Sequence, residues 1–309
     1  MVWVLLLVVV EQIVEAQKLA AQAQYGAAER ILQGALREAE REDPESPVAA
    51  TILNNLGTVQ QDLGRYREAE RSYQRALQIW ERLPGGSPAD PARPLNNLAG
   101  LYRTLGRLEK AEELYLRSLE LRERALGPDH PEVAGVLRNL GVVYYSQHRY
   151  AEAEEAYGRA RRIFEARLGP RHVELAGTLN NLGTLYRSQG RLVEAEELLR
   201  TASDILQETM GPAHPLFARS LKNLGVVCRD RGLHGESETL LRRALHITES
   251  ALGLRHPESG QILLEYAALL RQTRRKGEAG RMAKRARAIL QENRRENLLG
   301  LTVEASVRK

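Results

Sequence analysis

The stretch Leu179-Asn180-Asn181-Leu182-Gly183-Thr184-Leu185-Tyr186-Arg187-Ser188-Gln189-Gly190-Arg191-Leu192 decides how the chain is organised, because variants of it recur at one fixed interval. Its second asparagine belongs to a series spaced 42 residues apart, namely Asn55, Asn97, Asn139, Asn181 and Asn223. Glu265 occupies the next place in that series. A fixed period of roughly 20 to 50 residues is typical of stacked supersecondary units. We therefore read the 309 residues as one repeat array rather than as separate globular domains.

Each repeat contains two helical patterns. In the first, Leu179, Leu182 and Tyr186 form an apolar stripe, and Gly183 lies beside it where another helix can come close. The second pattern has the same spacing, as in Ala195, Leu199, Ala202 and Ile205. A glycine between the two patterns is expected to end the first helix in the left-handed conformation, at Gly64, Gly106, Gly190 and Gly232, while His148 takes this place in one repeat. The sequence thus predicts an all-α fold of antiparallel helix pairs.

The residues Leu182-Gly183, Tyr186, Gly190, Ala195, Leu199 and Ala202 resemble the tetratricopeptide repeat, whose usual period is about 34 residues. The longer period here, the Asn-Asn-Leu-Gly motif and the linker Leu126-Gly127-Pro128-Asp129-His130-Pro131-Glu132-Val133-Ala134 are similar to the kinesin light chain subtype. The resemblance covers roughly Val48 to Gln272. It implies a right-handed superhelical solenoid whose first helices line an inner surface that binds extended peptides of partner proteins. No heptad segment for pairing with a motor chain is found, so motor transport is not implied.

The array is expected to have atypical repeats at its ends, because such repeats cap the stack. We divide the chain into an apolar N-terminal segment (1–10), a degenerate N-terminal capping repeat (11–47), five regular repeats (48–257), a degenerate and basic C-terminal capping repeat (258–299) and a tail (300–309) that is expected to be disordered beyond Leu301. The proline-rich stretch from Leu83 to Pro94 replaces the usual linker and is the expected place of a bend.

The apolar segment from Met1 to Val10 allows three readings. It is too short to span a membrane, which needs about 20 residues. The first reading is that the segment is the first helix of the solenoid or the product of a misplaced start. The second is that it is a secretion signal or an anchor, and the third is that it is a loose tail. We expect a cytoplasmic protein that does not bind membranes, unless residues 1–10 act as a signal. Self-association through this segment is a further alternative.

The predicted site lies on the face of the first helices opposite the apolar stripe, at about 100° per residue. Stacked repeats bring residues of this face into rows that contain arginine, lysine and asparagine but no acid. Asp62 and Asp230 are the only acids expected at the edge, whereas other acids collect on the second helices. The predicted peptide-binding residues are Asn54, Arg93, Asn96, Arg103, Arg138, Tyr145, Asn180, Thr184, Arg187, Arg219, Lys222, Arg229 and Arg271.

These residue types suit an extended, acidic peptide. Arginine pairs with carboxylates through two parallel bonds, and asparagine both donates to and accepts from a peptide backbone. The alternative is that the arginines are merely solvated. The second asparagine of each pair, Asn55 to Asn223, lies nearer the flank and is either a ligand contact or a structural bond between neighbouring helices.

The linker histidines and the single cysteine could each be given a chemical role. The linker histidines His130, His172, His214 and His256 suggest a metal site, but equivalent positions are at least about one helix diameter (8–10 Å) apart, whereas zinc needs ligands near 2.1 Å. We therefore expect loop packing and no metal. Cys228 stands where other repeats have tyrosine and is read as a small core residue, with a reactive thiol as the alternative.

The sequence indicates a non-catalytic scaffold or adaptor without a cofactor. It has no glycine-rich phosphate loop, no His-Glu-x-x-His motif and no nucleophile constellation. Nucleic-acid binding by the basic inner surface is the main alternative, although aromatics make up only 5% of the chain and offer little base stacking. A module that senses peptides and regulates a partner is the other alternative.

Overall fold

The apolar stripes of the sequence become helices throughout the computed structural model, which describes residues 2–83 and 90–306. Within these ranges there are fourteen helices and no strand. They are α1 (Val2–Ala21), α2 (Tyr25–Glu42), α3 (Pro47–Asp62), α4 (Tyr66–Arg82), α5 (Ala92–Thr104), α6 (Leu108–Leu126), α7 (Pro131–Ser146), α8 (Tyr150–Leu168), α9 (Val173–Ser188), α10 (Leu192–Met210), α11 (Pro215–Asp230), α12 (His234–Leu252), α13 (Pro257–Gln272) and α14 (Lys276–Ser306).

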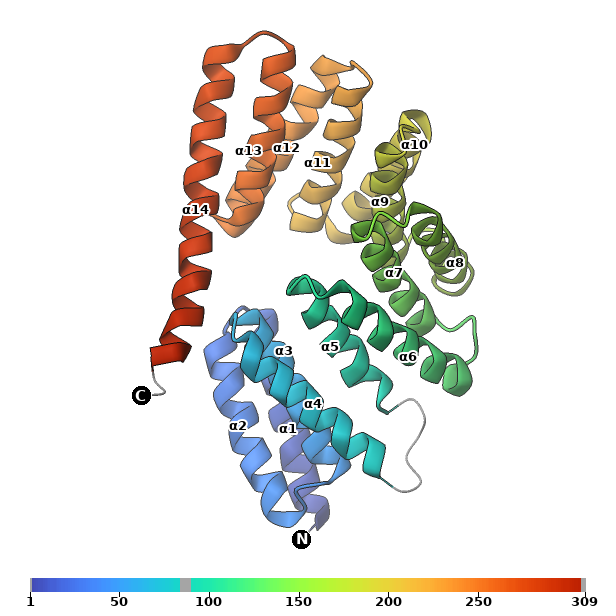
Figure 1. The fold of residues 1–309 in the computed structure, drawn as a ribbon, viewed down its shortest axis with the longest axis vertical. Coiled ribbons are helices and arrows are strands. Elements are labelled where there is room, and N and C mark those ends of the chain that lie inside the picture. The colour runs from blue at the N-terminus through green and yellow to red at the C-terminus, as the bar shows by residue number, and fades with distance from the viewer. Residues whose placement is uncertain (1, 84–89, 307–309) are drawn as a thin grey trace. The chain divides into compact units, whose positions relative to one another are not determined.

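The chain divides into an N-terminal unit, residues 1–147, and a C-terminal unit, residues 148–309, which we describe separately. In the N-terminal unit α1 packs on α2, α3 on α4 and α5 on α6, and α7 follows α6 (Figure 1). In the C-terminal unit α8 contacts α9, and the pairs α9 with α10, α11 with α12 and α13 with α14 follow. The predicted all-α solenoid of antiparallel helix pairs is confirmed.

First and second helices have different neighbours within each unit. The first helix of one repeat contacts the first helix of the next, from α1 to α3, α5 and α7 and again from α9 to α11 and α13. Successive second helices approach less closely, and long side chains bridge them, as in the ion pairs of Arg75 with Glu40 and of Arg200 with Glu236. The first helices therefore form the inner layer of each stack, and their common face is the surface on which the predicted site lies.

The turn inside each repeat is held by a residue in the left-handed conformation. Gly64, Gly106, Gly190 and Gly232 have φ angles of 76°, 73°, 78° and 81°, which confirms the predicted helix ends. His148 and Arg274 occupy the equivalent place with φ angles of 60° and 62°. Residues with a Cβ rarely adopt this conformation, so the surrounding turn imposes it on them.

Close helix pairing explains the glycine of the Leu-Gly motif. A Cβ added to Gly183 would lie 2.6 Å from Leu199 Cγ and 3.2 Å from the carbonyl oxygen of Ala195. At Gly57 it would lie 2.7 Å from the ring of Tyr73, which is itself 1% exposed in the core. The glycine is thus a packing requirement in these pairs.

The linker histidines are helix caps. His130, His172, His214 and His256 each precede a first helix and accept a hydrogen bond at Nδ1 from the backbone N–H two residues on, at 3.1–3.2 Å. This bond satisfies one of the free donors at a helix start. These histidines were expected to pack in loops, and their capping role was not predicted.

The described chain begins and ends in helices, at Val2 and at Ser306. Helix α1 is continuous through residues 10 and 11, and its Val9 and Ala16 are each 1% exposed in a core shared with α2 and α3. Helix α14 runs to Ser306, so the tail that was expected to be disordered beyond Leu301 is helical as far as it is described. The expected bend falls largely on residues 84–89, outside the described residues. No described helix is long and apolar enough to cross a membrane.

Candidate functional site

Asparagine side chains link the first helices of the N-terminal unit. Asn97 Nδ2 donates to Asn54 Oδ1 at 2.9 Å, and Asn139 Nδ2 donates to Asn96 Oδ1 at 3.2 Å. The second asparagine of one repeat therefore holds the first asparagine of the preceding repeat. These bonds use the acceptor oxygens of Asn54 and Asn96, and Asn96 Nδ2 also donates to Asn97 Oδ1 at 3.4 Å.

The other predicted residues of the N-terminal unit differ in exposure. Arg93 and Arg103 are exposed on α5, and Arg103 is hydrogen-bonded to the hydroxyl of Tyr115. Arg138 and Tyr145 on α7 are half-buried and have interactions of their own. The face of α5 therefore presents two guanidinium groups that a solvent-borne partner can reach.

Acids neutralise part of the predicted basic surface in the C-terminal unit. Arg187 Nε lies 2.6 Å from Asp230 Oδ2, and Arg229 Nη1 lies 2.6 Å from Glu265 Oε2. The expectation that only Asp62 and Asp230 border this face was wrong, because α13 contributes two further carboxylates. Glu265 takes the place of the second asparagine, and its partner Arg229 is only 7% exposed.

Lys222 is the second cation paired with α13. Its ammonium group lies 3.9 Å from Glu258 Oε1, and its side chain is 15% exposed. Burial lowers the pKa of Lys222, the negative charge of Glu258 opposes that shift, and the nearby Arg219 adds to it. Arg219 and Arg271 themselves are exposed.

Asn180 differs from its counterparts in the N-terminal unit. Its Nδ2 donates to the carbonyl oxygen of Ala176 at 3.2 Å, and its Oδ1 is buried without a hydrogen-bond partner. The hydroxyl of Thr184 donates to the carbonyl oxygen of Asn180 at 2.9 Å. A buried amide oxygen without a donor costs about 1–3 kcal/mol, so a ligand N–H that reached Asn180 would relieve this cost.

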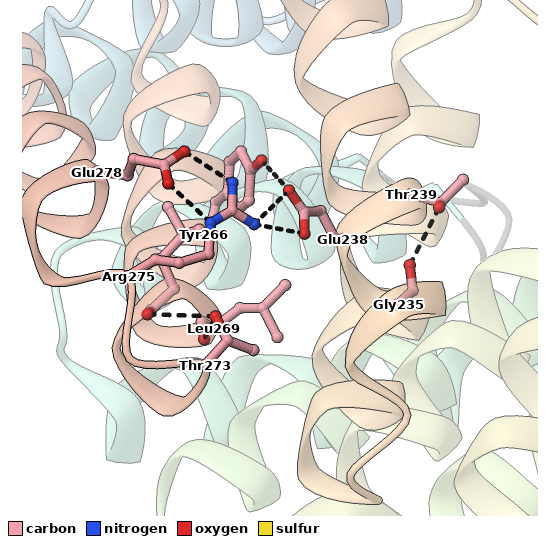
Figure 2. A network of polar contacts seen from close by, with 9 residues as sticks. Gly235, Glu238, Thr239, Tyr266, Leu269, Thr273, Arg275 and Glu278 are labelled. Carbon is pink, nitrogen blue, oxygen red and sulfur yellow. Dashed lines mark hydrogen bonds and ion pairs between the residues drawn. The ribbon is translucent and has the colours of Figure 1, made fainter.

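A polar network that the sequence analysis did not anticipate joins successive repeats. Figure 2 shows it between α12 and α13/α14: Glu238 accepts from the hydroxyl of Tyr266 at 2.7 Å and from Arg275 Nη1 at 2.7 and 2.9 Å. Arg275 also pairs with Glu278. The hydrogen bonds from Arg275 and Tyr266 lower the pKa of Glu238 against the opposing effect of burial.

The arginine–glutamate pair of this network recurs with the 42-residue period, whereas Tyr266 lies four residues before the place that Tyr102 and Tyr186 occupy in their repeats. Arg107 lies 3.5 Å from Glu70 and Arg191 lies 2.9 Å from Glu154, each with a tyrosine hydrogen-bonded to the carboxylate. Arg65 pairs with Glu29 at 2.8 Å at the first junction. The signal was present in the sequence, as glutamates at positions 70, 112, 154, 196 and 238 and arginines at 65, 107, 149, 191 and 275. We name this set the junction ladder.

One junction lacks two members of the ladder together. Cys228 stands in the tyrosine place and Leu233 in the arginine place, while Arg231 and Arg200 pair with Glu196 instead. Burial and the charges of Glu236 and Glu196 raise the pKa of the Cys228 thiol to about 12. The thiol is fully buried, which fits a core residue rather than a nucleophile.

Metal ligands are not brought together in the described part of the chain. No group of three or more His, Cys, Asp or Glu side chains with metal-binding geometry occurs there. The repeated histidines are used as caps, at the starts of α7, α9, α11 and α13. The candidate site is therefore a surface of amide and guanidinium groups.

An inner layer of first helices that carries polar side chains, with second helices behind it, defines an α-helical repeat scaffold of the kind that binds other proteins. A family model confirms this class: it is described as tetratricopeptide repeat and matches residues 16–82, 90–166, 136–208, 174–245 and 216–292. The chain belongs to the tetratricopeptide repeat family. No match is found among curated protein sequences.

Solved structures of repeat proteins confirm the fold. BtubC (BKLC) from P. vanneervenii is similar at 26% identity over 75% of this chain and 92% of that chain, with a TM-score of 0.63. The repeats of a putative kinesin light chain from Podosopora anserina are similar at 24% identity over 69% and 100%, with a TM-score of 0.56. RapI in its apo form shares the fold at 18% identity over 92% and 99%, with a TM-score of 0.71. The structural neighbours thus include kinesin light chain-like repeat proteins, which matches the resemblance seen in the sequence.

Proposed function

We propose that the protein is a non-catalytic adaptor that binds an extended, acidic segment of a partner protein on the inner face of its first helices. The observation that carries the proposal is the direct contact between successive first helices, which brings equivalent positions of neighbouring repeats onto one surface within each unit. Tetratricopeptide repeat proteins are generally scaffolds that bind proteins or peptides, and this supports the class of function.

The unequal charge pairing in the two units supports a refined site. In the C-terminal unit Arg187, Lys222 and Arg229 face acids of the same chain, so an acidic ligand must compete for them. In the N-terminal unit Arg93 and Arg103 are exposed. We therefore propose that the acidic part of the partner binds to the N-terminal unit and that Asn180 accepts a backbone N–H in the C-terminal unit.

A charge-reversal test follows from this arrangement. Arg103→Glu with Arg271→Glu changes one exposed inner arginine in each unit. Arg187→Glu is less suitable, because Arg187 Nε lies 2.6 Å from Asp230 Oδ2 in the folded protein. A glutamate at this position would place a second carboxylate beside Asp230 and destabilise the fold. The matched control is Arg67→Glu with Lys284→Glu, two exposed residues on second helices.

The assay is fluorescence anisotropy with a labelled peptide in which glutamate alternates with alanine, at physiological salt. We expect the inner variant to weaken binding by at least about tenfold, equivalent to ~1.4 kcal/mol, while the control changes it little. Equal loss in both variants would refute a site on the inner face.

Nucleic-acid binding is tested in the same experiment. A labelled single-stranded RNA replaces the peptide. If the RNA binds more tightly than the acidic peptide at physiological salt, the peptide proposal fails and the nucleic-acid alternative stands.

A further inference from the structure

A pocket of about 290 Å³ opens between α3, α4, α5, α6 and α7 of the N-terminal unit. It is at the small end of the usual range for ligand pockets, roughly 300–1,000 Å³, so it suits one side chain or a small molecule. Two of its lining residues, Asn54 and Arg93, belong to the predicted inner face. The pocket is therefore open to the same ligand as that face.

Arg122 of α6 brings an incompletely used guanidinium group to the pocket. Its side chain is 11% exposed, and its Nη1 lies 3.1 Å both from the carbonyl oxygen and from a carboxylate oxygen of Glu132. Its Nε is buried and has no hydrogen-bond partner. A buried donor on a charged group without an acceptor is costly, and an added acceptor would relieve that cost.

The remaining polar groups of the pocket also favour an acceptor ligand. Burial lowers the pKa of Arg122, and the charge of Glu132 opposes that shift. The positive charge of Arg93 is close enough to lower the pKa of Arg122 as well. Asn54 has its oxygen occupied by Asn97, so its amide offers only N–H groups. Glu132 is already paired with Arg122, and Asp90 has an interaction of its own. A carboxylate placed between Arg93 and Arg122 would meet donors and separate two repelling cations.

Apolar side chains provide a wall for a short hydrocarbon stem. Trp80 and Leu126 line the pocket with Pro94, and Trp80 also packs against the core of the N-terminal unit. An aspartate or glutamate side chain combines a carboxylate with such a stem. We propose that this pocket is the anchor for one carboxylate side chain of the acidic segment, a proposal that rests on the proposed function and assigns its main contact to Arg122 and Arg93.

Trp80 makes the pocket directly observable. The chain has two tryptophans, Trp3 and Trp80, so in a Trp3→Phe background the emission reports on Trp80 alone. The probes are the glutamate-alanine peptide, the same peptide with glutamine for glutamate, and N-acetylglutamate amide as a free small carboxylate. We expect the glutamate peptide to change the Trp80 emission in a saturable way and the glutamine peptide to leave it unchanged.

Variants assign the effect to the pocket. Arg122→Met should weaken the emission change and the peptide affinity by about tenfold or more. Arg93→Met, at an exposed residue, should act in the same direction without a risk to folding. Arg124→Met is the matched control on the same helix, because Arg124 is 68% exposed and pairs only locally with Glu120. It should leave both readouts unchanged.

The outcomes separate the anchor from the general function. If the peptide binds by anisotropy but neither moves Trp80 nor responds to Arg122→Met and Arg93→Met, the anchor is refuted and the proposed function stands. If the peptide fails to bind at all, both fail. If N-acetylglutamate amide alone changes the Trp80 emission while the peptide does not bind, the pocket is a site for free carboxylates and the peptide anchor is refuted.

Discussion

The same substitution, glycine to alanine, should have opposite effects at two positions of the C-terminal unit. At Gly183 on α9 the added Cβ would lie 2.6 Å from Leu199 Cγ and 3.2 Å from the backbone oxygen of Ala195, which cannot rotate away. At Gly280 on α14 the Cβ would meet nothing within 4 Å. The two sites therefore separate packing strain from helix propensity.

The magnitudes follow from these two terms. Alanine gains about 1 kcal/mol over glycine inside a helix, and overpacking costs about 1–3 kcal/mol. Because a backbone atom blocks relaxation at Gly183, we take the upper half of that range and expect Gly183→Ala to lower the free energy of unfolding by about 1–2 kcal/mol. Gly280→Ala should raise it by up to about 1 kcal/mol.

Urea unfolding followed by far-UV circular dichroism measures the difference. The slope of the transition must stay the same in both variants, because repeat arrays can lose cooperativity and the two free energies would then not be comparable. The reasoning is refuted if Gly183→Ala is as stable as the unchanged protein or more so. That result would mean that helices α9 and α10 can move apart without a loss of folding stability.

Four further outcomes are expected. Glu238→Gln should reduce the loss of folding stability on acidification, because the pKa of Glu238 is lowered below its ordinary 4.5 in the folded protein. The stabilisation from ionised Glu238 is present above pH 4.5 and is lost as the pH falls through the folded pKa. Urea midpoints measured from about pH 5 to 3 would show this difference, and a pH profile equal to that of the unchanged protein would contradict it. His172→Ala should cost about 1 kcal/mol in a urea titration and His172→Asp much less, since aspartate can also cap a helix; equal costs would argue against capping. Arg274→Gly should stabilise by about 1 kcal/mol in the same titration, because its φ of 62° suits glycine, and a loss would show that the side chain matters more than the backbone. Cys228, with a thiol pKa of about 12 and no exposure, should react with a thiol reagent only in urea; labelling of the native protein would contradict its burial.

The helix pairs were predictable because a period of 42 residues repeats the same evidence several times. Leu182 and Gly183 specify a stripe and a close approach, and the glycine turns specify where each first helix ends. Single exceptions such as His148 could be placed by register alone. The histidine caps were not predicted, because a capping bond through Nδ1 depends on a local backbone geometry that spacing does not reveal.

The candidate surface was predictable in position but not in charge. Helical arithmetic selected Arg187 and Arg229, yet it could not show that Asp230 and Glu265 from neighbouring repeats lie 2.6 Å away. Such pairs join residues about one repeat apart in the sequence, and they depend on how far successive first helices slide past each other. The pocket beside Arg122 was missed for the same reason, because second helices contribute to it.

The junction ladder bears on how such an array changes its length. Where the pair is present within a unit, a copy supplies a carboxylate to the copy after it, so duplication or deletion of a whole copy of this kind leaves donors and acceptors matched. Loss or gain of a single residue inside a copy affects only the pairs of that copy, and the first junction accommodates one such loss, because Glu29 and Arg65 are 36 rather than 37 residues apart and still pair at 2.8 Å. At one end of the ladder the arginine place holds Gln24, and at the other the glutamate place holds Gly280. A designer who wished to graft another copy after α14 would first have to restore an acid at position 280.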